Sequence, residues 1–373
     1  ERTNRWSERL LVSFNFLIVG SGLFGSVCAR ELTDHGLSCL VIDKRSHIGG
    51  NCYTFLEEGI HVHNYGPHIF HTSNDTVWNY VNKFVKFNNY RHHAVANYHG
   101  EIYSLPFSMW TFNKFWGVSK PSEAKEIIEK QKFVGTPTNL EEKALSMVGK
   151  DIYERLIKGY TTKQWMTDPK NLPCEIISRL PLRWTYDNNY FYDKYQGIPE
   201  NGYTELFDKL LDGINVELGL DYFNKRDYYD SLCEKVIYTG PIDRYYEYEY
   251  GHLEYRPLQF EHKTVATDNF QGHSIVNYTD EQTPYTRIVE HRHFGNCSSK
   301  NTVITYEYPT KWTGNEDPMY PINNSINTDK YNKYSKINSK TIFGGRLAEY
   351  RYYDMHQVIA SALKTTKDIL KEL

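Results

Sequence analysis

The clearest pattern of hydrophobic and polar positions lies near the start of the chain. Residues 16–19 form an apolar run that is too short for a helix and typical of a buried parallel strand. Residues 24–35 then follow a helical pattern, and residues 39–42 form a second apolar run. This order predicts a βαβ unit. Residues 76–87 carry a further helical stripe.

The pattern changes twice farther along the chain. Residues 90–105 alternate enough to predict a hairpin, whereas residues 108–165 are helical in pattern. Residues 180–199 are aromatic and β-like, and residues 245–308 contain four alternating stretches typical of an antiparallel sheet. Residues 355–373 form a long amphipathic helix. We therefore predict an α/β fold with an inserted helical domain and an antiparallel β-sheet domain.

The turn between the first strand and the first helix carries three glycines. Gly20, Gly22 and Gly25 have the spacing G-x-G-x-x-G, and Asp43 ends the second strand. Glycines at this position permit a tight turn, a close approach of phosphate to the backbone and close helix packing. The unpaired N–H groups of the helix attract the anion. The unit is predicted to bind a dinucleotide, with Asp43 on the ribose hydroxyls.

The residues that follow indicate which dinucleotide it is. Lys44, Arg45, Gly49-Gly50 and Asn51 extend the fingerprint in the way seen in flavoproteins that resemble the amine-oxidase and glutathione-reductase groups. This resemblance favours FAD over NAD.

Composition excludes several classes of partner. Lys plus Arg (43) nearly balance Asp plus Glu (46), so no basic field argues for nucleic acid. The 32 tyrosines fit the stacking of bases and the binding of sugar hydroxyls, or equally an AT-rich genome. The six cysteines form no C-x-x-C pair, which suits free thiols in a cytoplasmic protein. No apolar run approaches a membrane span, and residues 1–14 are expected to be a flexible extension.

Four histidines lie close together in the sequence, at positions 61, 63, 68 and 71. A metal site usually adds a nearby carboxylate or thiol, and none is placed here. We therefore predict no metal and keep the alternative that some of these imidazoles line a flavin.

Five separated motifs then become specific. They are GPHIFH, IKGYTTKQW, DNNYF, PYTRIVEH and GRLAEYRYYDM. Together they make the chain similar to the prokaryotic-type UDP-galactopyranose mutases from Asn15 to Leu373. The resemblance implies a discontinuous Rossmann-like FAD-binding domain, an inserted helical domain and a six-stranded antiparallel sheet.

The expected domain boundaries follow from this resemblance. The FAD-binding domain is expected over residues 15–88, 203–244 and 336–373, and the helical domain over 104–176 with a mobile lid at about 166–178. The antiparallel, substrate-binding sheet is expected over 89–103, 177–202 and 245–335.

The resemblance also implies an isomerase, an intramolecular transferase that interconverts UDP-galactopyranose and UDP-galactofuranose for surface glycans. Reduced flavin N5 would attack the anomeric carbon covalently. The implied partners are a UDP-sugar, NAD(P)H or a reductase as electron donor, and a second copy of the chain in a homodimer. A flavin-dependent oxidase of the amine-oxidase type and a nucleotide-sugar binding protein without catalysis remain as alternatives.

The resemblance assigns roles residue by residue. The catalytic residues are expected to be Arg179, Arg287 and His68, with the two arginines holding the diphosphate. The substrate-binding residues are expected to be Tyr160, Trp165, Tyr190, Asn277, Tyr320, Tyr352, Asp354, Glu307 and Arg256. The cofactor-binding residues are expected to be Gly20, Gly22, Leu23, Phe24, Gly25, Asp43, Lys44, Arg45, Gly50, Asn51, His63, His68, His71, Gly240, Arg346, Tyr352, Asp354 and Met355.

Three positions depart from the family pattern. His92 stands where many relatives have Asn, which puts a sugar contact in doubt. Leu156-Ile157 replaces Phe-Phe and affects the expected uracil pocket. Met166 replaces a glycine, which would stiffen the hinge of the lid. Whether 2-acetamido sugars are accepted stays open.

Overall fold

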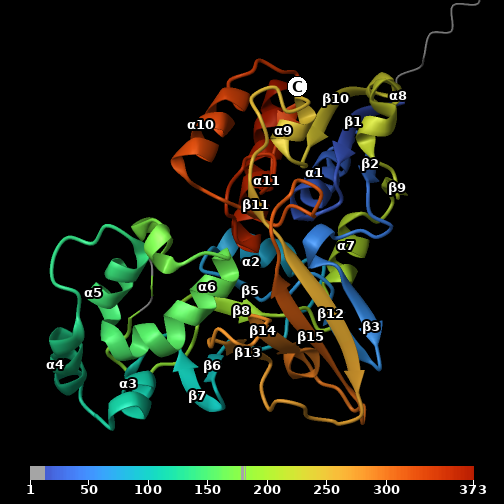
Figure 1. The fold of residues 1–373 in the computed structure, drawn as a ribbon. Coiled ribbons are helices and arrows are strands. Elements are labelled where there is room, and N and C mark those ends of the chain that lie inside the picture. Colours follow the sequence, from blue (N-terminus) through green and yellow to red (C-terminus); the bar gives the residue numbers. More distant parts are fainter. Residues whose placement is uncertain (1–12, 178–179, 181) are drawn as a thin grey trace, which may run out of the picture.

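The protein is described from a computed structural model, which covers residues 13–177, 180 and 182–373. A parallel sheet occupies the upper part of the molecule, helices form its lower left and a second sheet its lower right (Figure 1). The parallel sheet has the order β17-β10-β1-β2-β9 in the described part of the chain. Its strands are β1 (Phe14–Val19), β2 (Cys39–Asp43), β9 (Asn215–Leu218), β10 (Cys233–Tyr238) and β17 (Ile342–Phe343). All four pairings between them are parallel.

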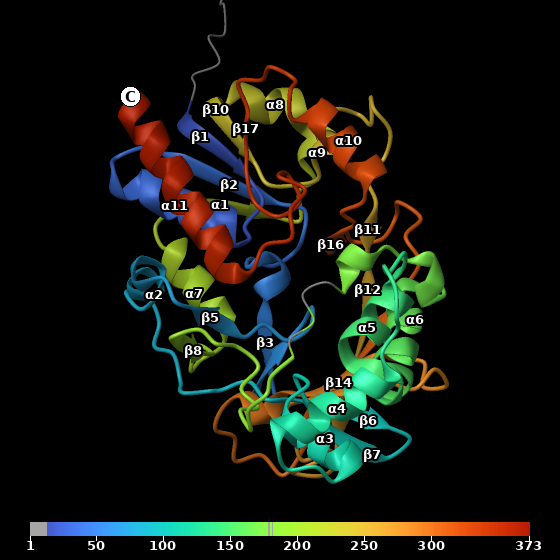
Figure 2. The same cartoon turned by 90° about the vertical axis from the view of Figure 1, so that its left-hand side faces the viewer.

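Successive apolar side chains of β1 point to opposite faces of this sheet, and each face is covered by a separate cluster of buried residues. Phe16 and Ile18 belong to one buried cluster, together with residues of α1 (Leu23–Asp34) and α11 (Met355–Glu372). Leu17 points to the other face, where it packs with tyrosines. Successive side chains of a strand point to opposite faces, so the continuous apolar run predicts helices or turns on both sides. Figure 2 shows α1 and α11 together on one side of the sheet.

The second sheet has the strand order β12-β15-β14-β13-β6-β7. Its strands are β6 (Ala94–Tyr98), β7 (Glu101–Leu105), β12 (Leu258–Val265), β13 (Ile275–Tyr278), β14 (Arg287–Glu290) and β15 (Thr302–Pro309). Four pairings are antiparallel, but β13 and β6 run parallel. The expectation of a purely antiparallel sheet was therefore wrong at this one pairing, where two segments distant in sequence meet.

The helical part packs around its own core beside the hairpin β6–β7. It contains α3 (Met109–Trp116), α4 (Pro121–Gln131), α5 (Leu140–Ile152), a π-helical segment (Tyr153–Lys158) and α6 (Gly159–Trp165). The hairpin side chains Ala96 and Tyr103 join this core, so the helices are fixed to the second sheet.

The remaining helices and strands connect these parts. The helices are α2 (Asp75–Val81), α7 (Tyr203–Leu210), α8 (Arg226–Ser231), α9 (Ile242–Tyr245) and α10 (Ser325–Tyr334). The strands are β3 (Thr54–Glu57), β4 (Ile60–His63), β5 (Phe70–Thr72), β8 (Tyr195–Gly197), β11 (Tyr255–Arg256) and β16 (Tyr320–Pro321).

Two expected elements differ from the structure. Among the described residues of the aromatic stretch 180–199, β8 is the only strand of more than one residue, beside isolated bridges of Leu182 and Pro199. This strand pairs with β5 instead of joining the six-stranded sheet with which 177–202 was grouped. The aromatic side chains of the stretch lie in a loop, where they stack on neighbouring rings. The helix expected over 76–87 ends at Val81, and Phe87 instead forms an isolated bridge with Pro199.

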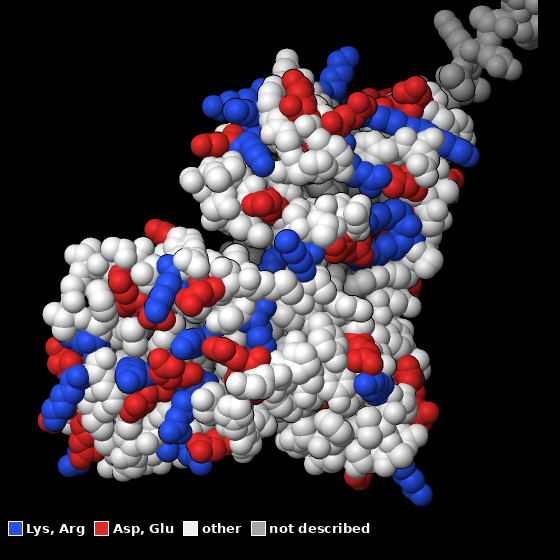
Figure 3. Space-filling view, viewed as in Figure 1, with Lys and Arg blue, Asp and Glu red and all other residues white. Residues whose placement is uncertain are grey.

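Charges of both signs are interspersed over the face seen in Figure 3. Among the described residues, no helix is long and apolar enough to cross a membrane.

Candidate functional site

A cavity of about 540 Å³ lies at the carboxyl ends of β1, β2 and β10. This is the edge at which open parallel sheets bind ligands. The cavity brings together most of the predicted cofactor residues, namely Gly20, Gly22, Leu23, Phe24, Gly25, Asp43, Lys44, Arg45, Gly50, Asn51, His68, Gly240, Arg346 and Met355.

The glycine turn is packed as a phosphate cradle requires. A Cβ on Gly25 would lie 1.9 Å from the carbonyl oxygen of Gly20, so any side chain would push α1 away from β1. Gly20 has φ +111°, and Gly22 faces only the Cα of Gly50. No side chain caps the N-terminus of α1, and its first N–H groups are therefore left for a ligand. These residues fit a dinucleotide pyrophosphate.

Asp43 is fixed beside this turn. Its Oδ2 accepts hydrogen bonds from the N–H and hydroxyl of Ser21, both at 2.7 Å, and its Oδ1 accepts from the N–H of Arg45 at 2.9 Å. Each carboxylate oxygen keeps further acceptor capacity, so the group can still take ribose hydroxyls.

A loop from the far end of the chain reaches over this part of the cavity. Asp317 pairs with Lys44 at 2.8 Å and with Arg45 at 3.2 Å. Burial raises the pKa of Asp317, but its contacts with the two cations outweigh this and hold the pKa below its usual range. The sequence analysis missed Asp317, because its partners are more than 270 residues away and no local motif marks it.

Aromatic residues at the same cavity were also missed. Tyr248 stacks on His252 with ring centroids 4.0 Å apart. Further lining residues without a sequence signal are Phe223, Arg244, Tyr255 and Trp312.

A second group of predicted residues forms a ladder of arginines and aromatic rings. The guanidinium of Arg256 lies 5.1 Å from the Trp165 ring centroid and 5.0 Å from that of Tyr320. Arg346 lies 5.3 Å from Tyr320 and 5.8 Å from Tyr352. The ladder joins α6, β11 and β16 to the loop before α11, and it combines phosphate-binding cations with flat surfaces for a base.

Arg287 on β14 and Glu307 on β15 lie opposite each other in the second sheet and form an ion pair. Glu307 on β15 is almost fully buried, and its carboxylate accepts from Nε of Arg287. Burial raises the pKa of Glu307, and the neighbouring Arg287 offsets part of this. Burial lowers the pKa of Arg287, but the Glu307 charge outweighs burial and keeps the guanidinium protonated. Burial also raises the pKa of Tyr160, although Arg287 opposes this, so its phenol stays neutral.

His68 connects the two groups. The pKa of His68 is lowered to about 4, mainly by burial. The hydrogen bond to the Gly66 carbonyl opposes this shift, and the charges of Arg346 and Arg287 add to it. The Gly66 carbonyl can only accept, at 2.8 Å from Nδ1, so Nδ1 carries the proton. His68 lines the cavity, and its Nε2 atom is therefore a hydrogen-bond acceptor.

The structure places two predicted cofactor histidines behind or beside this residue. His63 is buried and accepts the His68 N–H at 3.0 Å, so it supports the turn and does not line the cavity. The Nδ1 of His71 on β5 lies 2.7 Å from a carboxylate oxygen of Asp193, to which it donates a hydrogen bond, and the ring stacks on Phe191.

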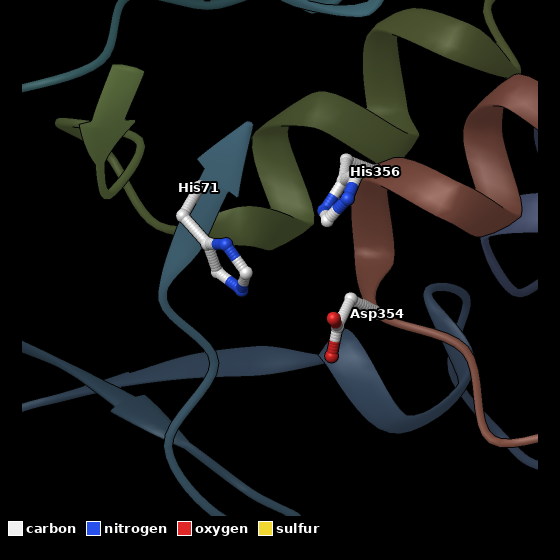
Figure 4. Close-up of side chains that lie close together, drawn as sticks. All are labelled: His71, Asp354 and His356. Carbon is white, nitrogen blue, oxygen red and sulfur yellow. The ribbon is translucent and has the colours of Figure 1, made fainter. Parts of the chain in front are cut away.

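His71, Asp354 and His356 converge at the start of α11 (Figure 4). Their possible ligand atoms lie within 4.8 Å of one another, close enough for the three side chains to share one ion. Asp354, however, caps α11, and the positive end of a helix dipole disfavours a cation. We propose no metal at this cluster.

Three other predicted residues lie around the ladder or outside the described chain. Asn277 on β13 is paired with Arg287 in register, and its amide donates to the Val95 carbonyl at 3.1 Å. Tyr190 is partly exposed, and its N–H donates to the His92 carbonyl. Arg179 lies outside the described residues.

The segment predicted as a lid follows directly after Trp165. Met166 ends α6 in the left-handed conformation, with φ 52°, a position that glycine would occupy without strain. Leu172 and Ile177 pack into the core of the helical part. Movement of this segment stays a prediction.

Comparisons with known proteins agree on one family. Residues 155–352 match the family model described as UDP-galactopyranose mutase, and residues 18–84 match one described as an NAD(P)-binding Rossmann-like domain. The chain is 40% identical over 370 residues to a dTDP-fucopyranose mutase from Escherichia coli, covering 95% of this chain and 98% of that one. It is also 40% identical over 372 residues to a probable UDP-galactopyranose mutase from Klebsiella pneumoniae, covering 96% and 95%.

The fold is similar to the crystal structure of a reduced UDP-galactopyranose mutase, with a TM-score of 0.71 over 96% of both chains. At 14% identity this likeness shows the fold alone. The predicted α/β fold with a Rossmann-like domain is confirmed.

Proposed function

Because the chain belongs to the UDP-galactopyranose mutase family, we propose that it interconverts UDP-galactopyranose and UDP-galactofuranose. The observation that supports this substrate is the Arg287–Glu307 pair, in which the carboxylate is buried and the guanidinium is 24% exposed. The guanidinium charge acts on the neutral phenol of Tyr160 and on His68, which lines the dinucleotide cavity. A diphosphate leaving group needs a fixed cation, and this site provides one. The flavin-dependent oxidase is less supported, because the family model and the relatives at 40% identity are those of mutases.

FAD is the dinucleotide that we propose for the cavity. The glycine cradle, the Asp43 carboxylate and the volume of about 540 Å³ support it. Bound and reduced, the flavin would supply the nucleophile for the anomeric carbon.

The roles of the protein side chains follow from their chemistry. Arg287, together with Arg179 outside the described residues, would hold the diphosphate and stabilise its charge when the bond to the sugar breaks. Arg256 would contact the substrate, and Arg346, which lines the cavity, would contact the cofactor. Tyr160 and Trp165 would contact the uridine, and the Nε2 of His68 would accept a hydrogen bond at the cofactor edge of the site. These assignments rest on the positions described above, except that of Arg179, which rests on the family resemblance.

The test uses dithionite-reduced protein that contains its flavin. UDP-galactofuranose is added, and UDP-galactopyranose is followed by anion-exchange chromatography, with oxidised protein as control. Conversion by the reduced form without hydrogen peroxide is expected. Hydrogen peroxide with net loss of sugar would instead identify an oxidase.

A second candidate substrate is dTDP-fucopyranose. The Escherichia coli relative that carries this name is as similar to the chain, at 40% identity, as the Klebsiella protein. Parallel assays with both nucleotide sugars measure the ratio of the two kcat/KM values. A ratio that favours the dTDP-sugar would replace the first candidate.

Loss of the Asp317 carboxylate is expected to weaken FAD retention without changing the chemistry. Because Asp317 is 41% exposed, each of its two ion pairs is worth about 1 kcal/mol or less, and D317N should raise the FAD dissociation constant about two- to fivefold. Flavin released on gel filtration measures this. E200Q, which removes the exposed Lys86–Glu200 pair, is the control and should retain FAD normally.

The remaining partners are still predictions. We propose NAD(P)H or a reductase as electron donor, and a homodimer, on the family resemblance alone.

A further inference from the structure

Lys163 lies on α6 between two residues of the proposed substrate site but points away from them. Tyr160 is one turn before it, and Trp165 is two residues after it. The Nζ of Lys163 donates to the carbonyl oxygens of Tyr278 at 2.8 Å and Tyr285 at 3.0 Å. Lys163 belongs to the motif IKGYTTKQW, but no role was assigned to it there, and it does not line the cavity.

The two carbonyls stand at the base of the loop that connects β13 to β14. Tyr278 ends β13, and its N–H donates to the Thr286 carbonyl at 2.8 Å. Thr286 in turn donates its N–H to the Glu307 carbonyl at 2.9 Å. Arg287 follows directly and begins β14. One of the two carbonyls is thus two residues before the arginine proposed to hold the diphosphate, and the other belongs to the neighbour of Asn277, which pairs with that arginine.

A second contact fixes the other end of α6 to the same loop. A Cβ on Gly159 would lie 2.3 Å from the carbonyl oxygen of Thr279, so the helix backbone touches the loop directly. Gly159 and Lys163 are four residues apart and lie on one face of the helix. The Lys163 bonds therefore give α6 a second point of attachment to the loop, about one helical turn from the Gly159 contact.

Among the described residues, no carboxylate oxygen lies within 4.0 Å of the Lys163 ammonium, so its charge has no ion-pair partner there. Asp280 is the nearest acid to influence it, but its two oxygens accept from the N–H and hydroxyl of Thr283, at 2.7 and 2.9 Å. Burial lowers the pKa of Lys163 to about 8, and Asp280 opposes this. The Lys163 ammonium therefore has no ion pair with a described residue to stabilise the fold. Its contribution is the two hydrogen bonds that it donates to the carbonyl groups of the loop.

We propose that Lys163 is a positioning residue that holds Tyr160 and Trp165 on α6 in register with Arg287 on β14. This inference rests on the proposed function for the identity of those three side chains as a nucleotide-diphosphate site. Lys163 touches no substrate. On α6, Trp165 packs against the core of the helical part and Lys163 does not, so loss of the ammonium leaves that apolar contact in place.

The test measures UDP binding, which does not depend on mutase turnover. In flavin-loaded protein, K163A is expected to raise the dissociation constant of UDP about tenfold, since two charge-assisted hydrogen bonds are lost. Flavin content and the thermal midpoint should change little. Titration calorimetry with UDP gives the affinity, and kcat and KM are measured in parallel.

K158A is the matched control. Lys158 lies one residue before α6, is 38% exposed and pairs with Glu154 at 3.6 Å, so its loss should leave UDP affinity unchanged. Added ethylammonium should restore UDP binding to K163A, because it can supply the missing ammonium, whereas sodium at the same ionic strength should not. If K163A is poorly folded, K163M, which keeps the apolar stem, takes its place.

The results separate the possibilities. Weakened UDP binding with rescue by ethylammonium supports the positioning role, even if the protein proves to act on another nucleotide sugar. Unchanged UDP affinity in K163A, or an equal loss in K158A, overturns it. Absence of UDP binding in the unmodified protein would overturn the proposed function itself.

Discussion

R287M is expected to lower kcat/KM for the nucleotide sugar by roughly 10²–10³-fold, the cost of removing one preorganised charge stabiliser from an active site. The thioether cannot donate to phosphate, and the charge that develops on the leaving diphosphate then has no fixed partner at β14. Flavin content should stay normal, because Arg287 does not line the dinucleotide cavity. Steady-state kinetics and flavin absorbance measure the two effects.

The same substitution leaves Glu307 buried without its partner. Removing one member of a buried ion pair costs about 3–5 kcal/mol, and we expect R287M to lower the free energy of unfolding by a similar amount. Because burial raises the pKa of Glu307, the folded protein holds this proton more tightly than the unfolded chain, and stability falls as the pH rises above the unfolded value. R287M should therefore be less destabilised at acidic pH than at alkaline pH.

A double variant separates folding from chemistry. R287M/E307Q removes the unpaired charge and should regain stability without regaining turnover. R287K keeps the charge but loses the fork of donors, and should fall between R287M and the unmodified protein. If the double variant recovers full activity, Arg287 acts only through the fold.

G25A is expected to abolish FAD binding. The added methyl group would lie 1.9 Å from the Gly20 carbonyl and 3.1 Å from a methyl group of Ile18, so α1 must move off β1. Overpacking of this kind costs roughly 1–3 kcal/mol or more, and the displaced N-terminus of α1 no longer offers its N–H groups to the pyrophosphate. Urea unfolding and flavin absorbance of the purified protein measure both effects.

G295A is the matched control for that change. Nothing lies within 4 Å of a Cβ built on Gly295, and its backbone is not left-handed. Its stability should stay within about 0.5 kcal/mol of the unmodified protein. Normal FAD content in G25A would show that the close packing of α1 and β1 is not needed for the cofactor.

The sequence predicted those strands and hairpins that follow from the pattern of apolar and polar residues within a short segment. The run 16–19, the hairpin around Gly100 and the alternating stretches of 245–308 form as expected. The stretch 180–199 was misread because its aromatic alternation comes from rings that stack in a loop. For example, Phe191 lies against His71 with ring centroids 3.7 Å apart. Periodicity cannot distinguish side chains that face a sheet core from side chains that face other loops.

The site residues that the sequence missed share one property. Asp317 and Lys163 each act on a partner that is more than 100 residues away, Lys44 in one case and the loop before Arg287 in the other. Asp317 lies in none of the five family motifs, and Lys163 lies in IKGYTTKQW, which by itself does not show what its side chain contacts. Their roles follow only from which loops the fold brings together.

By itself the sequence determined the dinucleotide turn, because a tight turn, a close helix and an acid at the next strand end are properties of about 30 consecutive residues. The family motifs pointed to the individual side chains of the proposed substrate site. Only the tertiary structure decided that Trp165, Arg256 and Tyr320 form one ladder, that Asp317 closes over Lys44 and that Lys163 binds the loop before Arg287. Those contacts join segments far apart in the chain, and their geometry depends on how separate clusters of buried residues pack against one another, which no local pattern records.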